Sequence, residues 1–322
     1  MYNEELKTMF INSISKQSSQ SIALSTFEMI SQFESELDKD ICYFTEEEIK
    51  KVIPKISVAL GGTTKRGPRV QALCNYAKWC VSEGISGINE EMFANLKGDP
   101  TAKIKQYMVK DPQHLATVMN VLFRPVNQIT IDNIYHAAYW FSFCGVEREE
   151  LASLQASQID MDKHTIKSSN GIYHIVPEAV DVIRSCLDIK TFKIIHPKYT
   201  REGEDPRYDM PEYVLRGTND LFNPALMQET ISRKFKKLSG MGIIIPRVKL
   251  ESVKMSGIFY RMYQDNLRGN PVDFSNEVEN DLKRIEYTNL QKKRYSREAF
   301  VNMKNNQYIA DYNNWLQAFY GK

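Results

Sequence analysis

Two clusters of closely spaced cations are the residues in this sequence best suited to bind a ligand. The first cluster consists of Lys65, Arg66 and Arg69. The second, in the segment SRKFKKLSG, includes Arg233, Lys236 and Lys237. The first cluster stands where a helix is predicted to begin, and free backbone N–H groups beside cations suit a phosphate group. The alternative is that these side chains only solubilise an exposed turn.

The distribution of charge supports the same chemistry. The net charge is only +2, but residues 61–110 carry eight Lys and Arg against four Asp and Glu, and residues 221–322 carry seventeen against ten. Two basic segments in a nearly neutral chain predict two basic surfaces that could close on one polyanion. Solvated helix faces would give the same counts, so charge alone leaves both interpretations open.

Composition limits the class of protein. A chain of 322 residues with 42% hydrophobic and 25% charged residues is long enough for two soluble domains. No apolar run of about 18 residues is present, so no membrane span is expected, and the segment MYNEELKTMF has no secretory pattern. The five cysteines form no CxxC pair. We therefore expect a cytoplasmic protein with no metal and no cofactor.

Residues 1–110 are predicted to hold a flexible segment and a small helical domain. Residues 1–20 are polar and are expected to be flexible, and the domain is expected over residues 21–110. Apolar spacing predicts a helix over Ser21–Leu37, and Thr45 caps a second helix that runs to about Leu60. A third follows Arg69 and ends at Gly84, and a short fourth lies near residues 89–96.

Residues 111–322 form the second predicted domain. Helices are expected over 114–123, 130–143, 147–154 and 178–187, then after Pro224, from about Ser252, and towards the C-terminus. Between them, residues 159–166 and 172–176 are predicted strands, and Asn170–Gly171 is a hairpin signal.

The order of these elements resembles the tyrosine recombinase, or phage integrase, family over about residues 20–320. GVEREELASLQASQID resembles the family motif G-L-R-x-x-E-L-x-x-L, and TIKSSNGIYHIVP resembles the hairpin that follows it. LESVKMSGIFYRMY resembles the motif H-x-L-R-H-T/S. The resemblance implies a mainly α fold with a small antiparallel β-hairpin or sheet. It implies a two-domain clamp: a helical SAM-like core-binding domain and an α+β catalytic-like domain.

The residues at the family's reactive positions depart from the pattern. The first arginine, which binds the scissile phosphate, is replaced by Glu147, and a carboxylate repels a phosphodiester. Arg148 is adjacent, but on a helix it would point about 100° away. The second arginine is replaced by Lys254, which lacks the bidentate fork, and the histidine after it is Met255.

The remaining reactive positions have no firm match. No histidine follows His196. The candidates for the C-terminal nucleophile are Tyr308, Tyr312 and Tyr320, of which Tyr312 is nearest by position. The candidates for the hairpin lysine are Lys163 and Lys167. The sequence therefore predicts a scaffold that binds DNA without strand transfer.

Three functions remain in view. The first is a sequence-specific repressor of a phage or prophage, similar to the repressors of large SPbeta-like Bacillus phages, that binds double-stranded operator DNA near the host nucleoid. Its expected DNA contacts are Lys65, Arg66, Arg69, Arg148, Arg233, Lys236, Lys237, Lys249 and Lys254. The second is an active, divergent recombinase, and the third is a non-DNA interaction or accessory protein. The family exchanges a C-terminal helix between subunits, which implies self-association through residues 305–319.

Overall fold

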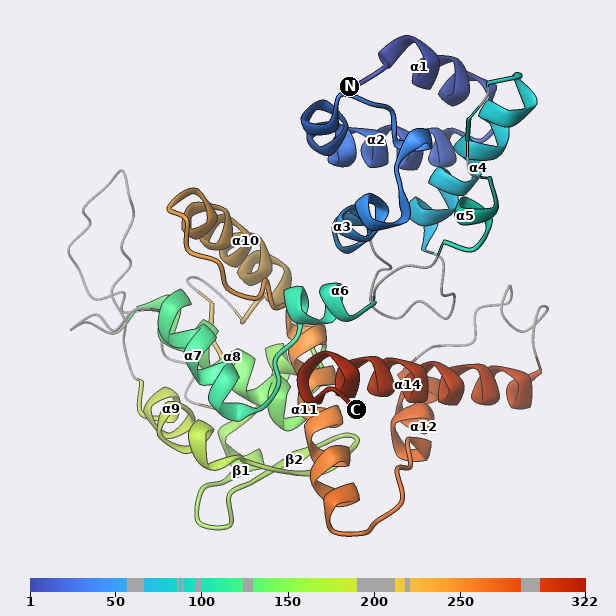
Figure 1. The fold of residues 1–322 in the computed structure, drawn as a ribbon. Helices are drawn as coiled ribbons and strands as arrows, with labels where there is room; N and C mark the ends of the chain where they lie inside the picture. The colour runs from blue at the N-terminus through green and yellow to red at the C-terminus, as the bar shows by residue number, and fades with distance from the viewer. Residues whose placement is uncertain are drawn as a thin grey trace. The chain divides into compact units, whose positions relative to one another are not determined.

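The protein is mainly helical and divides into two compact units. The computed structural model describes residues 1–56, 67–85, 87–88, 90–96, 100–123, 130–189, 212–217, 221–284 and 296–322. One unit comprises residues 1–105 with 287–322, and the other comprises residues 106–286. The predicted fold class is confirmed, because the described residues form helices and one small antiparallel sheet (Figure 1). The division differs from the predicted domains at residues 287–322, which fall in the first unit.

The first unit is built from helices. They are α1 (Glu4–Ser13), α2 (Gln17–Leu37), the 3-10 turn η1 (Ile41–Tyr43), α3 (Glu46–Ile56), α4 (Pro68–Ser82), α5 (Glu90–Ala94) and α14 (Arg297–Tyr320), with α6 (Pro100–Tyr107) at its boundary. Helix α4 begins with Pro68, whose fixed φ suits the first helical position. Helices α2 and α4 pack together, and the rings of Phe27 and Tyr76 lie 4.9 Å apart between them.

The polar N-terminus is more ordered than its composition suggests. In place of the flexible segment expected over residues 1–20, the structure has helix α1 and the start of α2. Lys7 is fully buried and its ammonium contacts both carboxylate oxygens of Glu34 at 2.5 Å. Phe10, one turn further, packs on Phe27 and Tyr76. A buried ion pair and an aromatic anchor therefore hold the segment in place.

The second unit consists of helices and a three-stranded sheet. The helices are α7 (Pro112–Leu122), α8 (Ile131–Cys144), α9 (Pro177–Leu187), α10 (Pro224–Gly240), α11 (Leu250–Leu267) and α12 (Ser275–Arg284). The strands, in the order β1-β2-β3, are β1 (Ile159–Asp160), β2 (Thr165–Ser168) and β3 (Gly171–His174). Helix α8 begins at a reciprocal cap: Thr130 accepts from the backbone N–H of Asp132, and Asn133 accepts from that of Thr130.

Helix α8 is the centre of this core and α11 lies directly against it. Ten consecutive or near-consecutive side chains of α8, from Ile134 to Cys144, are buried. Gly257 of α11 is so close to α8 that a Cβ atom there would lie 1.9 Å from the Phe143 carbonyl oxygen. Arg261, one turn on, donates to the same oxygen at 2.9 Å. Only a glycine at position 257 permits this approach, which fixes the register of α11 on α8.

The segment between α8 and the sheet differs from the prediction. The helix expected over residues 147–154 is instead a turn followed by two 3-10 turns, η2 (Leu151–Ser153) and η3 (Ala156–Gln158). The reason is a tertiary contact, because the Glu150 carboxylate accepts from the Ser168 hydroxyl at 2.6 Å and the Ser169 N–H at 3.0 Å. The hairpin is confirmed, but Gly171 (φ 138°) already belongs to β3 and pairs with Ser168.

Among the described residues, no helix has the length and apolar character needed to cross a membrane.

Candidate nucleic-acid interface

Glu147 and Lys254 meet as a buried ion pair at the end of α8. Gly145 ends that helix, and the ring of Tyr173 lies so close that a Cβ atom at Gly145 would be 2.7 Å from its Cδ1 atom. Val146 then enters the core, and the next residue, Glu147, forms an ion pair with the Lys254 ammonium. The Glu147 side chain is 8% exposed. The carboxylate therefore neutralises the ammonium within the protein.

The position of Lys254 follows from the packing of α11. Lys254, Gly257 and Arg261 are spaced three and four residues apart and so share one face of the helix. Because Gly257 sits against the Phe143 carbonyl and Arg261 donates to it, the face that carries Lys254 is held towards the end of α8. The two altered motifs therefore meet in space, through an interaction that the sequence did not reveal.

More ionisable groups surround this pair than the sequence prediction included. Burial raises the pKa of Glu277 on α12, with Glu147 and Asp281 acting in the same direction and Lys254 and Arg261 opposing it. Asp281 itself is only 5% exposed. Two cations therefore face three carboxyl groups. An anionic phosphodiester would meet an environment that already favours cations.

Tyr173 closes the cluster on the side of the sheet. Burial raises the pKa of its phenol to about 12, and the nearby carboxylates Glu277, Glu147 and Glu150 add to the effect. The phenol therefore stays neutral at ordinary pH. Burial also lowers the pKa of Arg261 from its usual value. Glu277, Asp281 and Arg261 were absent from the sequence prediction, although the helical spacing from Lys254 would have identified Arg261.

Arg148 and Met255 directly follow Glu147 and Lys254 in the sequence. The Arg148 guanidinium donates to the Glu251 carboxylate at 2.7 Å, and both side chains are about one-third to one-half exposed. Burial acts to raise the pKa of Glu251. Hydrogen bonds from the backbone, Gln228 and Arg148 outweigh burial, so the pKa is lower than its usual value. Met255 is half-buried, and its thioether has no proton to transfer. Arg148 is thus engaged with a carboxylate.

The candidate nucleophiles lie on α14 in the first unit. Tyr308 and Tyr312 are buried and Tyr320 is half-buried. The ring of Trp315 stacks on Tyr312 at 6.2 Å and lies 5.3 Å from Tyr320. These tyrosines are part of an aromatic row along one helix.

Most cations of α10, unlike Lys254, are exposed to solvent. Arg233, Lys236 and Lys237 are exposed on the C-terminal half of this helix. Arg233 pairs weakly with Glu229 one turn earlier, at 3.4 Å. Lys236 and Lys237 form no ion pair with any residue that the structure describes. The neighbouring Lys234 instead turns inward, where it pairs with Asp132 and lies over the Phe123 ring.

Two further cations follow α10 on the way to α11. Arg247 is exposed and donates from Nη2 to the Ser239 hydroxyl at 3.4 Å, which ties it to the end of α10. Lys249 is exposed just before α11. We call the exposed residues Arg233, Lys236, Lys237, Arg247 and Lys249 the α10 basic surface. Arg247 is an addition to the predicted contacts, and its proximity to α10 was not visible in the sequence.

The first cationic cluster is described only in part. Lys65 and Arg66 lie outside the described residues. Arg69 is half-buried in the first turn of α4. It lies near Lys103 of α6, whose pKa is lowered by burial and then by the charge of Arg69. Two cations held close together against their mutual repulsion favour an anionic partner.

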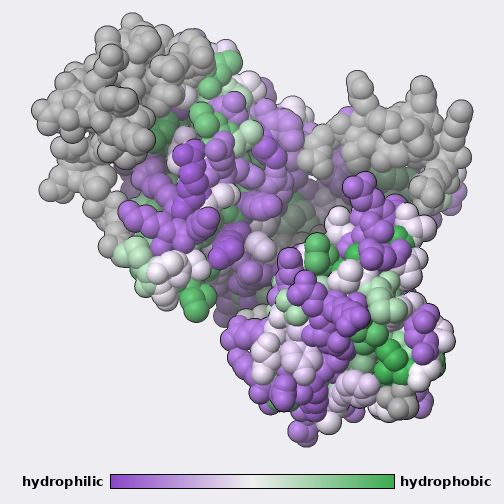
Figure 2. Space-filling view, turned by 90° about the horizontal axis from the view of Figure 1, so that it is seen from above, coloured by the Kyte–Doolittle hydropathy of each residue, from purple (hydrophilic) through white to green (hydrophobic). Residues whose placement is uncertain are grey.

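The face of the molecule shown in Figure 2 is largely polar. In the view of Figure 2 hydrophilic residues cover most of the coloured surface, with hydrophobic residues scattered in small groups among them. A nucleic-acid surface of this kind binds through charge and hydrogen bonds more than through a wide apolar face.

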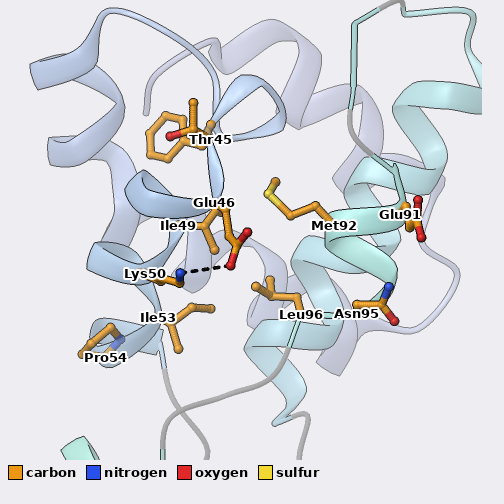
Figure 3. Close-up of a pocket in the computed structure, with 11 residues that line it drawn as sticks. Thr45, Glu46, Ile49, Lys50, Ile53, Pro54, Glu91, Met92, Asn95 and Leu96 are labelled. Carbon is orange, nitrogen blue, oxygen red and sulfur yellow. Dashed lines mark ion pairs between the residues drawn. The ribbon is translucent and has the colours of Figure 1, made fainter.

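A hollow of about 700 Å³ in the first unit offers little chemistry (Figure 3). Its walls come from α3 and α5, and its lining mixes apolar side chains such as Ile49, Ile53, Met92 and Leu96 with the charged Glu46, Lys50 and Glu91. The Glu46–Lys50 ion pair at its rim spans 3.0 Å between side chains that are 74% and 69% exposed. Exposed pairs of this kind contribute little to stability.

Comparisons with known proteins place the first quarter of the chain in context. Residues 1–82 match the family model described as "MrpR, N-terminal core-binding domain". The crystal structure of XerA recombinase is similar at 12% sequence identity and a TM-score of 0.36, covering 83% of this chain and 86% of that chain. No curated protein matches the sequence. Residues 1–82 are therefore similar to a core-binding domain, which the resemblance implied for residues 21–110.

Proposed function

We propose that this protein is a sequence-specific DNA-binding regulator, a phage or prophage repressor, on a tyrosine-recombinase-like scaffold that does not carry out strand transfer. The observation that carries the proposal is the contrast between two sets of cations. Lys254 is buried and neutralised by Glu147, whereas Lys236 and Lys237 of the α10 basic surface are exposed. The match of residues 1–82 to a core-binding domain supports the scaffold.

The absence of strand transfer is proposed from the charge of the cluster. A phosphodiester would have to displace Glu147 from Lys254, and breaking a buried pair costs about 3–5 kcal/mol. Arg148 would have to leave Glu251 to reach the reaction centre. Catalysis of phosphoryl transfer needs cations and proton donors placed at the developing charge. Glu147 and Met255 give that position the opposite character, because a carboxylate repels the phosphate and a thioether has no proton to donate.

The binding function is proposed from the α10 basic surface. Each cation that neutralises a phosphate releases a counterion, so the logarithm of affinity falls with the logarithm of salt concentration by about 0.9 per contact. If three to five cations of this surface touch phosphates, the slope is expected to be roughly −3 to −5. Arg69 and Lys103 in the first unit would add to it if both units engage one duplex.

Two kinds of measurement on the whole chain test the proposal. The first is selection of duplexes from a random-sequence pool, followed by fluorescence-anisotropy titration at several salt concentrations. A selected consensus with a steep salt slope is expected. Weak binding that ignores salt would favour a non-DNA accessory role. Genome-wide mapping of bound sites in the host then tests the regulatory role, because a repressor is expected at few sites near promoters.

The second measurement distinguishes a binding protein from an active recombinase. A selected duplex with a nick beside each potential cleavage position traps covalent protein–DNA adducts if a tyrosine attacks. No adduct is expected. An adduct that disappears in a Y308F/Y312F/Y320F variant would contradict the proposal and establish the active enzyme instead.

A further inference from the structure

The loop after α10 exposes an isoleucine to an unusual degree. Residues 241–246 read MGIIIP. Ile244 is 94% exposed, the highest value among the exposed large hydrophobic side chains of the described residues, and Met241 is 58% exposed. Leaving such a side chain in water forgoes about 1.5–3 kcal/mol of burial. A single exposed apolar residue is ordinary, so the surroundings of Ile244 decide whether it matters.

The loop is held firmly at both ends. On the α10 side the Met241 N–H donates to the Lys237 carbonyl at 3.1 Å and the Ile243 N–H to the Leu238 carbonyl at 3.0 Å, with Gly242 at φ 74°. On the other side the Arg247 N–H donates to the Gln106 carbonyl at 2.7 Å. Ile243 is half-buried and Ile245 packs against the core. Ile244, between them, therefore points outwards from a fixed support.

Cations flank this apolar tip on both sides along the chain. Lys236 and Lys237 lie near the C-terminal end of α10 before it, and Arg247 and Lys249 follow it. The Arg247–Ser239 hydrogen bond brings the second pair back to the end of α10. A partner that fits must therefore offer closely spaced negative charges with an apolar interior reachable between them.

Double-stranded DNA has that character, because stacked bases lie between two rows of phosphates. Proteins that bind the minor groove often insert one apolar side chain between base pairs and hold the flanking phosphates with cations. An anionic membrane also combines charge with an apolar interior. However, membrane-surface segments present a long apolar helix face, whereas this loop presents one isoleucine and one methionine.

We infer that Ile244 is a wedge that enters the minor groove of bound DNA and partly unstacks a base step, while Lys236, Lys237, Arg247 and Lys249 hold the adjacent phosphates. This inference rests on the proposed DNA-binding function. It predicts that the bound DNA is bent. It also predicts a preference for a flexible base step such as TA, because unstacking is least costly there.

The test compares I244A and I244S with a matched control. Leu226, 48% exposed at the other end of α10, supplies the control L226A. The probe is the tightest-binding duplex selected by the wild-type protein, labelled at both ends for energy transfer and carrying 2-aminopurine at successive positions. We expect I244A to lower affinity about 5- to 20-fold at an unchanged salt slope, in line with loss of one buried isoleucine. The bend and the 2-aminopurine fluorescence increase should also be lost.

Each outcome decides a different point. If I244A and I244S bind and bend the duplex like L226A and the wild type, the wedge is wrong and the DNA-binding function stands. If the wild type selects no duplex, the proposed function fails and the wedge fails with it. If Ile244 is needed only for binding vesicles of phosphatidylcholine with phosphatidylglycerol, the loop is a membrane contact. Circular dichroism of each variant verifies folding.

Discussion

The lysines of the second unit show two opposite uses of the same side chain. Lys254 is enclosed beside α8 and its charge is cancelled by Glu147. Lys236 and Lys237 stand in solvent on α10 with no partner among the described residues. A lysine identified from a motif is thus not by itself a phosphate ligand. Its availability depends on whether the fold supplies a carboxylate, and that is decided by residues distant in sequence.

The largest effect is expected from placing an arginine at position 147, where the recombinase motif has one. E147R would place a third cation beside Lys254 and Arg261 in a mostly buried site. We expect a loss of stability on the order of 5 kcal/mol, because one buried charge loses its partner and like charges then repel. Urea unfolding measures it. Strand transfer on nicked duplexes is expected to remain absent, and adducts formed by E147R would show that the other replacements matter less than proposed.

Substituting Lys254 tests the same ion pair by removing its cation. K254M leaves Glu147 buried without its partner and should cost about 3–5 kcal/mol. The double variant E147L/K254M removes both charges and should recover most of that loss, since an apolar pair of similar volume is often at least as stable. Additive losses in the double-mutant cycle would mean that the ion pair contributes no coupling.

Substitutions in the α10 basic surface are expected to lower the affinity for DNA and to leave stability unchanged. K236A/K237A should weaken binding to a selected duplex by roughly tenfold at moderate salt and make the salt slope shallower by about two, one unit for each lost contact. The control R268A/K283A removes two exposed cations elsewhere in the second unit. Anisotropy titrations compare the two, and equal losses would mean that net charge, not the α10 basic surface, governs binding.

The smallest expected effect is on pH dependence. Because burial raises the pKa of Glu277, the folded protein holds this proton more tightly than the unfolded chain. Stability should therefore fall as pH rises from the ordinary carboxyl pKa of about 4.3 through the raised folded value, and level off above it. E277Q should remove that part of the pH profile in urea unfolding. The exposed neighbour on α12 gives the control, E279Q, which should keep the wild-type profile.

The sequence predicted the elements better than their connections. Apolar spacing and capping residues such as Thr130 located α8, and the helices α7, α9 and α11 fall within a few residues of their predictions. The helix expected after Glu147 was wrong because Glu150 bonds to the hairpin serines, a contact with no local signal. The order in α1 was missed because Lys7 reads as a surface residue until Glu34 is placed beside it.

The candidate site was predicted in part for the same reason. Motif register identified Glu147 and Lys254, but nothing in the motifs states that they bond to each other. Glu277 and Asp281 come from α12, more than 20 residues after Lys254, and no recognised motif covers that segment. On the surface, the sequence identified Lys236 and Lys237 directly, because an exposed cation on a helix needs no distant partner to be recognised.

The Glu147–Lys254 pair has a consequence for how this chain can change over generations. Because both charges are buried, replacing either one alone leaves the other unpaired, and the intermediate is less stable than either end point. Routes of one substitution at a time towards a phosphate-binding arginine at position 147 therefore pass through poorly folded variants. Surface positions such as Lys236 have no such barrier. Exposed positions on α10 can therefore change freely, while the buried pair keeps its present charge arrangement.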